Sequence, residues 1–157
     1  ALSERVALLS GLPISIFDDV RAEITLTEGA VELITQLQAD GNQVAVVSGG
    51  FIEVISPLMK SLSIEHYKAN SLEIHAGKLT GKVQGTIVNR QEKAAYLRQL
   101  QKQLNPSRTI AVGDGANDIE MVQAADLGIA FCAKHALKEA ADVAIDKRDL
   151  REILRVL

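Results

Sequence analysis

The sequence predicts an α/β fold in which a Rossmann-like parallel sheet carries helices on its faces. Short apolar runs alternate with amphipathic stretches along the chain, and this alternation is typical of successive βαβ units. Aromatic residues make up only 3% of the chain and Trp is absent, so the core rests on Ala, Val, Ile and Leu. Such side chains suit helices packed on a parallel sheet. The 157 residues are enough for one domain with a sizeable core.

Four apolar runs are expected to form buried strands, and they cover residues 43–47, 109–112, 127–131 and 142–145. One helix should begin near Ala30 and end at Asp40-Gly41, where glycine suits a left-handed C-cap. A second should run over 91–104 and stop before Asn105-Pro106. Further helices should begin near Asn117 and Asp149, and Pro57 should kink or restart the helix after Phe51.

Two regions interrupt this alternation. Residues 1–25 have a helical pattern and run into the core without an obvious linker. Residues 70–88 carry alternating apolar side chains around His75-Ala76-Gly77-Lys78, which predicts a hairpin inserted as a small flap.

Composition excludes several classes of function. The net charge of −3 comes without a cluster of Lys and Arg, which argues against binding to nucleic acid. No apolar run approaches about 18 residues, so we expect no transmembrane helix. A single cysteine, Cys132, precludes an internal disulfide and is compatible with the cytoplasm. The chain lacks the layout of a secretory signal and begins with Ala, which suggests that an upstream segment has been removed.

The segment from Thr109 to Asp118 (Thr-Ile-Ala-Val-Gly-Asp-Gly-Ala-Asn-Asp) joins a predicted strand to a helix. Ligands of open α/β sheets collect at the carboxyl ends of strands, where Asp114 should lie. Asp118 follows four residues later and should point back to the same edge. Two carboxylates with an Asn between them suit Mg²⁺, which prefers oxygen ligands. The alternative is a tight Gly-Asp-Gly turn followed by an N-cap.

Two further segments add anion-binding groups. Ser48-Gly49-Gly50 follows a predicted strand and precedes a helix, so its hydroxyl and backbone N–H groups can form an anion site. A plain βα turn with Ser48 as N-cap is the alternative. Lys93 lies in the first turn of a helix, where its charge opposes the helix dipole. A local rule broken in this way often marks a functional position, although a lone lysine is usually solvated.

Together these segments resemble a known family. The combination of Val-Val-Ser-Gly-Gly-Phe, Lys93 and Val-Gly-Asp-Gly-Ala-Asn-Asp-Ile-Glu-Met is similar to the haloacid-dehalogenase-like superfamily, and within it to the phosphoserine phosphatase family. The similarity extends to segments outside the shared core, among them Ala69-Asn70, Gly77-Lys-Leu-Thr-Gly81 and Gly128-Ile-Ala-Phe-Cys-Ala-Lys134. It implies that residues 1–25 are the remnant of a helical cap and that residues 26–157 form the core with the flap.

The resemblance also implies a role for each matching residue. Asp114 would bind Mg²⁺, and Asp118 would support the metal site and catalysis. Lys93 would neutralise charge on the phosphate and on the attacking carboxylate. The remaining substrate contacts would come from Arg5 for the substrate carboxylate, Ser48 and Gly49 for the phosphoryl group, and Asn117. The implied reaction converts L-phosphoserine to L-serine and phosphate through an aspartyl-phosphate, a step of serine biosynthesis.

One expected segment is not found in these residues. The family places its nucleophile in an Asp-x-Asp-x-Thr/Ser segment on the first core strand, and the sequence contains none. Asp18-Asp19 has the wrong spacing and lies after Arg5, so we interpret it as a solvated helix face. We therefore expect the nucleophile and its strand to lie in a missing N-terminal segment of the same protein. The alternatives are an enzyme for another small phosphate ester, or a chain that is non-catalytic as it stands.

Overall fold

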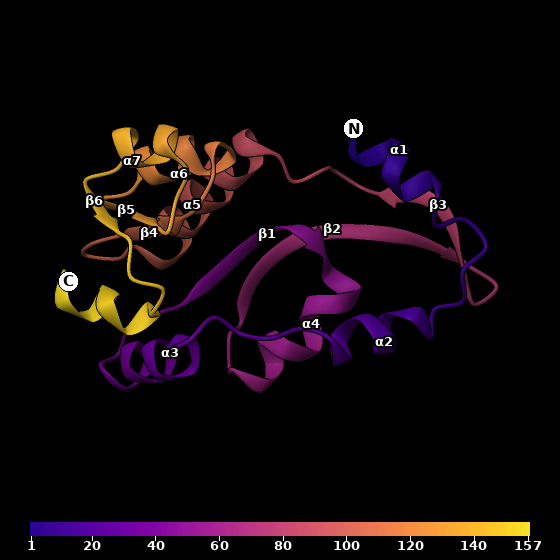
Figure 1. The fold of residues 1–157 in the computed structure, drawn as a ribbon, viewed down its shortest axis with the longest axis horizontal. Coiled ribbons are helices and arrows are strands. Elements are labelled where there is room, and N and C mark those ends of the chain that lie inside the picture. The colour runs from indigo at the N-terminus through magenta and orange to yellow at the C-terminus, as the bar shows by residue number, and fades with distance from the viewer. The chain divides into compact units, whose positions relative to one another are not determined.

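The computed structural model describes residues 1–157. The chain forms two compact units, which are described separately (Figure 1). The first unit comprises residues 1–25 and 43–88, and the second comprises residues 26–42 and 89–157. No helix is both long and apolar enough to cross a membrane.

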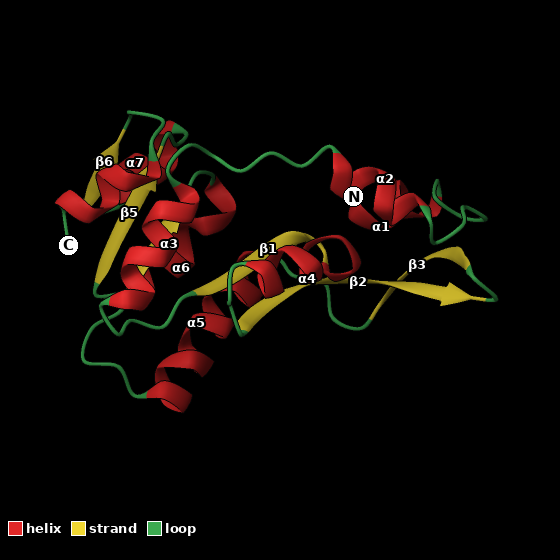
Figure 2. Cartoon of the chain, turned by 90° about the horizontal axis from the view of Figure 1, so that it is seen from below, coloured by secondary structure: helices red, strands yellow, loops and turns green.

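The first unit is built on a three-stranded sheet with the order β1-β2-β3. Strand β1 (Ala45–Phe51) runs parallel to β2 (His66–His75), and β2 pairs antiparallel with β3 (Lys78–Gln84). The turn at Ala76-Gly77 joins β2 to β3, as the predicted hairpin requires. Helices α1 (Leu2–Ala7), α2 (Ile16–Ala22) and α4 (Ile52–Ser61) complete the unit (Figure 2).

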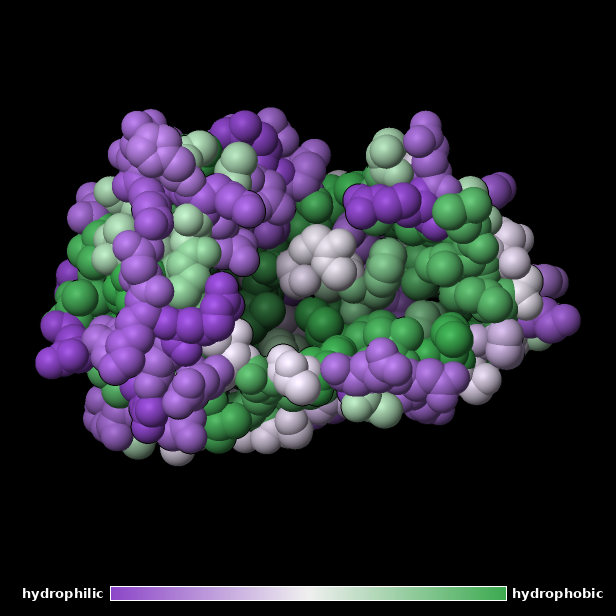
Figure 3. All heavy atoms as spheres, viewed as in Figure 1, coloured by the Kyte–Doolittle hydropathy of each residue, from purple (hydrophilic) through white to green (hydrophobic).

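The core of the first unit joins α1, α2 and α4 to the hairpin. Its buried members are Val6, Phe17, Val54, Leu72 and Leu79. Apolar side chains also gather on the face of this unit that is visible in Figure 3. The large exposed apolar residues of the unit are Leu8, Ile14, Val20, Ile24, Ile74 and Ile87.

The second unit contains an all-parallel sheet with the order β4-β5-β6. Its strands are β4 (Ile110–Gly113), β5 (Leu127–Phe131) and β6 (Val143–Ile145). Its helices are α3 (Ala30–Ala39), α5 (Arg90–Leu104), α6 (Ile119–Ala124) and α7 (His135–Ala140), with 3-10 helices η1 (Ala116–Asp118) and η2 (Leu150–Arg155). A cluster around Leu33, Ile129 and Ile153 forms its core. The predicted α/β class is confirmed.

Most predicted elements of the second unit lie within one residue of their expected bounds. Strands β4 to β6 and helix α5 follow the predicted ranges. Helix α5 ends at Leu104, and its C-cap Asn105 has a φ of 46°. Helix α3 ends before Gly41, which has the predicted positive φ. A helix begins next to Asp149 as predicted, and it is a 3-10 helix. The short helix α7 was not predicted.

The first unit departs further from the sequence-based expectation. Strand β1 covers residues 45–51 rather than 43–47, because its pairing with β2 shifts register after Val47 and resumes at Phe51. Pro57 lies inside α4 instead of restarting it. Proline lacks the N–H that would bond to the carbonyl of Glu53 four residues earlier. The Nη1 atom of Arg21 donates to that carbonyl oxygen at 2.7 Å, so the backbone group freed by Pro57 is satisfied.

Candidate active site

The side chain of Asp118 is buried and holds the turn after β4 by hydrogen bonds to its backbone. This residue is 5% exposed, and its Oδ2 accepts hydrogen bonds from the backbone N–H groups of Asp114 at 3.0 Å and Gly115 at 3.3 Å. Asp118 occupies the N-cap position of α6 but makes no capping hydrogen bond with its side chain. Its carboxylate therefore orders the turn that carries Asp114 rather than the helix that follows.

Gly113 makes this arrangement possible, because it lets the Asp118 side chain lie directly against the backbone. A β-carbon at position 113 would lie only 2.7 Å from both Cγ and Oδ2 of Asp118. Any side chain at this position would displace the Asp118 carboxylate from the turn. The glycine at the end of β4 is thus required by the packing of Asp118.

Lys93 meets the other oxygen of the same carboxylate. Its Nζ lies 2.9 Å from Asp118 Oδ1, and the lysine is only 8% exposed. The side chain of Asn89 caps α5 by accepting from the N–H of Glu92 at 2.9 Å, and this cap places Lys93 at the start of the helix. The interpretation of Lys93 as a solvated residue is wrong. The carboxylate of Asp118 offsets the unfavourable position of its charge near the helix N-terminus.

Asp114 presents the carboxylate that remains available. Asp114 is exposed, and its side chain makes no hydrogen bond or ion pair. Its backbone carbonyl accepts a hydrogen bond from the N–H of Lys134 at 3.0 Å. Asn117 is exposed in the same turn. No group of three or more His, Cys, Asp or Glu side chains can hold a metal ion. Mg²⁺ commonly takes one or two carboxylates and completes its shell with water and phosphate, so the turn fits a single direct ligand, Asp114.

Ser48 and Gly49 lie in the first unit, at the register shift of β1. The Oγ of Ser48 accepts a hydrogen bond from the N–H of Gly50 at 2.9 Å, within β1. It does not cap α4, whose N-cap is Phe51. A β-carbon at Gly49 would meet no atom within 4 Å. The segment Ser48-Gly49-Gly50, called the glycine loop below, therefore has open space beside Gly49.

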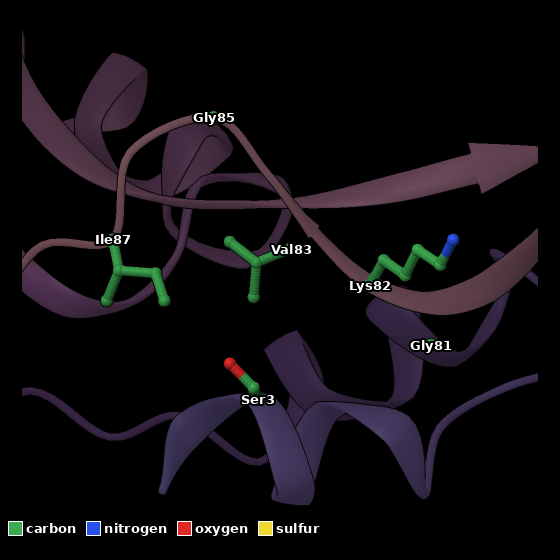
Figure 4. A pocket seen from close by; sticks show the side chains of 6 residues that line it. All are labelled: Ser3, Gly81, Lys82, Val83, Gly85 and Ile87. Carbon is green, nitrogen blue, oxygen red and sulfur yellow. The ribbon is translucent and has the colours of Figure 1, made fainter.

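Other polar side chains of the first unit lie apart from the glycine loop in sequence. Arg5 is exposed on α1 and makes no side-chain hydrogen bond. Asp18 and Asp19 are exposed on α2, and Asp18 pairs with Arg21, as a solvated helix face predicts. A pocket of about 400 Å³ lies between α1 and β3, and Figure 4 shows the residues that line it. Of the side chains that line it, only Ser3 and Lys82 are polar, and it contains none of the predicted site residues.

Sequence reasoning gave no role to one buried polar residue, Asn70. It is 1% exposed on β2, and its side chain contacts the backbone of Gly49 and Val88. An Ala-Asn pair within a strand carries no local signal of such contacts, because they join segments 18 and 21 residues away.

Comparison with known proteins shows the family. The sequence pattern of the haloacid dehalogenase-like hydrolases matches residues 2–123, a range that holds every predicted site residue. The chain belongs to the haloacid dehalogenase-like hydrolases. This confirms the resemblance drawn from the sequence.

Similar members of the family are phosphoserine phosphatases. The phosphoserine phosphatase of Lactococcus lactis is 52% identical over 156 residues, which are 98% of this chain and 72% of the relative. That of Methanocaldococcus jannaschii is 46% identical and is covered to 75% of its length. Among solved structures, a substrate-bound phosphoserine phosphatase aligns with a TM-score of 0.93 at 46% identity, over 99% of this chain and 75% of the other.

Proposed function

We propose that this chain forms most of the active site of a phosphatase that hydrolyses L-phosphoserine to L-serine and phosphate. The observation that carries the proposal is the buried carboxylate of Asp118, which joins the cation of Lys93 to the turn of Asp114. Such an arrangement links a buried positive charge, through one carboxylate, to the turn that carries the carboxylate proposed for the metal. The identity of 52% to a phosphoserine phosphatase supports the choice of substrate.

Lys93 and Asp118 act together in this proposal. The ammonium group of Lys93 neutralises charge on the phosphoryl group during transfer, which is the main demand of phosphoryl-transfer catalysis. Asp118 holds the lysine in place through Oδ1 and the Asp114 turn through Oδ2. Because both of its oxygens are engaged, we assign Asp118 to positioning and leave direct metal binding to Asp114.

The other predicted residues bind the substrate. The hydroxyl of Ser48 and the N–H of Gly49 hold phosphoryl oxygens, and Asn117 contacts the substrate from the turn after β4. Arg5 binds the substrate carboxylate, since a guanidinium offers a bidentate fork for a carboxylate. Arg5 is free for this task because its side chain makes no hydrogen bond within the protein.

Asp114 would hold Mg²⁺, the ion that the family generally uses. When bound, the metal supplies positive charge to the phosphoryl oxygens and orients the phosphate for in-line attack. Asp114 suits this task because its carboxylate is exposed and has no protein partner. The turn holds its backbone in place from both sides, through Asp118 and Lys134.

The nucleophile of the proposed reaction lies outside these 157 residues. No Asp-x-Asp-x-Thr/Ser segment occurs among them, and we place it in an N-terminal segment of the same protein. The phosphoryl group would pass to that aspartate, with cleavage of the bond between phosphorus and the serine oxygen. Water would then hydrolyse the aspartyl-phosphate. A cytoplasmic location belongs to the same proposal.

Phosphate release with Mg²⁺ tests the proposal on the protein that carries the nucleophile segment. L-Phosphoserine should be preferred over phosphoethanolamine, which lacks only the carboxylate, and over p-nitrophenyl phosphate. The variant Arg5→Ala should raise KM for phosphoserine at least tenfold and leave KM for phosphoethanolamine unchanged, because it removes one charged hydrogen-bonding partner. Equal turnover of all three esters would reject phosphoserine as substrate and retain the phosphatase activity.

The absence of the nucleophile segment favours a second candidate for the isolated chain, a non-catalytic phosphate-binding fold. Intact-mass spectrometry first establishes that a preparation contains these 157 residues alone. Such a preparation should release no phosphate with Mg²⁺. Turnover by a chain of verified mass would reject the placement of the nucleophile outside it.

A further inference from the structure

Asn70 holds the glycine loop through a buried side chain. Its Nδ2 donates to the carbonyl oxygen of Gly49 at 2.8 Å, and its Oδ1 accepts from the N–H of Val88 at 2.7 Å. One partner is a carbonyl and the other an N–H group, so only one orientation of the amide satisfies both. Asn70 is also the only buried polar residue of the first unit, at 1% exposure.

The contact with Gly49 supplies order that the sheet does not. Strand β1 pairs with β2 at Val47 and again at Phe51, and the register shifts between them. The peptide between Gly49 and Gly50 is instead held at both ends, since its oxygen accepts from Asn70 and its N–H donates to Ser48 Oγ at 2.9 Å. Because Ser48 Oγ accepts that bond, its hydroxyl proton stays available for an oxyanion.

We propose that Asn70 is a positioning residue for the phosphoryl group. By fixing the peptide after Gly49, it sets the direction of the Ser48 hydroxyl and of the open backbone at Gly49. The inference rests on the proposed role of Ser48 and Gly49 in phosphate binding. It adds a residue that touches neither substrate nor metal and acts through the glycine loop alone.

Two substitutions separate this role from simple packing. Asn70→Asp keeps the shape of the side chain and the acceptor for Val88, but above the pKa of the new carboxyl it turns an acceptor toward the carbonyl of Gly49. Tyr67→Phe is the matched control. It lies on the same strand and removes one hydrogen bond to α4, that of the Tyr67 hydroxyl with Ser56 Oγ at 3.0 Å, without contact with the glycine loop.

Titration of the ¹⁵N-labelled chain with inorganic phosphate measures the effect through the Gly49 and Gly50 amides. At pH 8 we expect Asn70→Asp to weaken phosphate binding roughly tenfold relative to the unsubstituted chain, the usual effect of losing one buried hydrogen bond. Because position 70 is buried, desolvation should raise the pKa of the new carboxyl. At a pH below that pKa, located by titrating the variant, the protonated carboxyl donates again, so this ratio should shrink toward one. Tyr67→Phe should bind phosphate normally at both pH values.

The outcomes distinguish this inference from the proposed function. If phosphate does not shift Gly49 in the unsubstituted chain, both the phosphate role of the glycine loop and the positioning role of Asn70 are overturned. If phosphate binds but Asn70→Asp binds it equally well at pH 8, only the role of Asn70 is overturned. If Asn70→Asp does not fold, a measurement on the unsubstituted chain still tests the inference. The side-chain amide signals of Asn70 should shift at the same phosphate concentration as Gly49, and unmoved signals would refute the inference.

Discussion

The buried pair of Lys93 and Asp118 makes a sharp prediction about stability. We consider the variants Lys93→Met and Asp118→Asn, singly and together, each of which keeps the approximate size of the side chain it replaces. The chain has no Trp and two tyrosines. In a Tyr67→Phe background, Tyr96 on α5 is the only tyrosine, and its fluorescence reports on the second unit.

The expected magnitude follows from the distance and the burial. At 2.9 Å and an effective dielectric constant of about 20, two unit charges attract by roughly 6 kcal/mol. Most of this attraction is offset by the cost of removing both charges from water. Asp118→Asn leaves the ammonium buried and unpaired, so the free energy of unfolding should fall by about 3–5 kcal/mol. Lys93→Met should cost less, because the carboxylate keeps its two N–H donors.

The double variant should be less destabilised than the sum of the two single variants by about 2 kcal/mol. Urea unfolding followed by Tyr96 fluorescence gives all four free energies. Arg90 and Glu120 provide the matched control. Their pair joins α5 to α6, next to the contact of α5 with η1, but it is exposed, with N and O atoms 3.3 Å apart. The cycle of Arg90→Met and Glu120→Gln should couple by less than about 1 kcal/mol. Equal coupling in the two cycles would refute the claim that burial makes the Lys93 pair special.

Three further predictions concern the second unit. Gly113→Ala should lower the free energy of unfolding by about 1–3 kcal/mol through overpacking. Gly115→Ala should lower it less, because the new β-carbon would meet only the amide oxygen of Asn117 at 3.3 Å. Equal losses in urea unfolding would contradict this prediction. Hydrogen bonds from Arg151 lower the pKa of Asp149 to about 2. Their stabilisation is therefore complete above the ordinary pKa of 3.8 and is lost as the pH falls toward 2, and acid unfolding of Asp149→Asn should lack this dependence. Leu137→Ala, at a fully buried position, should cost about 2–5 kcal/mol in the same urea assay, and a loss below 1 kcal/mol would show that the site collapses.

The sequence was sufficient where local pattern and fold agree. The apolar run before Gly113 and the Gly-Asp-Gly turn predict a strand end with Asp114 at its edge, and β4 ends at Gly113 as expected. The capping residues Asn89 and Asn105 bound α5 within one residue of the predicted range. In these segments the residues that decide the structure are neighbours in the chain, so a single sequence contains the necessary information.

Prediction was less successful where distant segments decide the structure. The continuity of α4 through Pro57 depends on Arg21, which lies in another helix and satisfies the carbonyl of Glu53. The extension of β1 through Ser48 and Gly49 depends on its renewed pairing at Asn70. Neither contact can be predicted from neighbouring residues, because each joins residues about twenty or more positions apart.

Lys93 illustrates how such a distant contact compensates for a locally unfavourable residue. A lysine in the first turn of a helix is unfavourable by roughly 0.3–1 kcal/mol, and its burial costs more. Asp118 offsets both with one oxygen, while its other oxygen closes the turn of Asp114. Since a single rigid carboxylate contacts both groups, a shift of the lysine must also move the turn. The charge proposed for the phosphate and the carboxylate proposed for the metal are therefore mechanically coupled through Asp118.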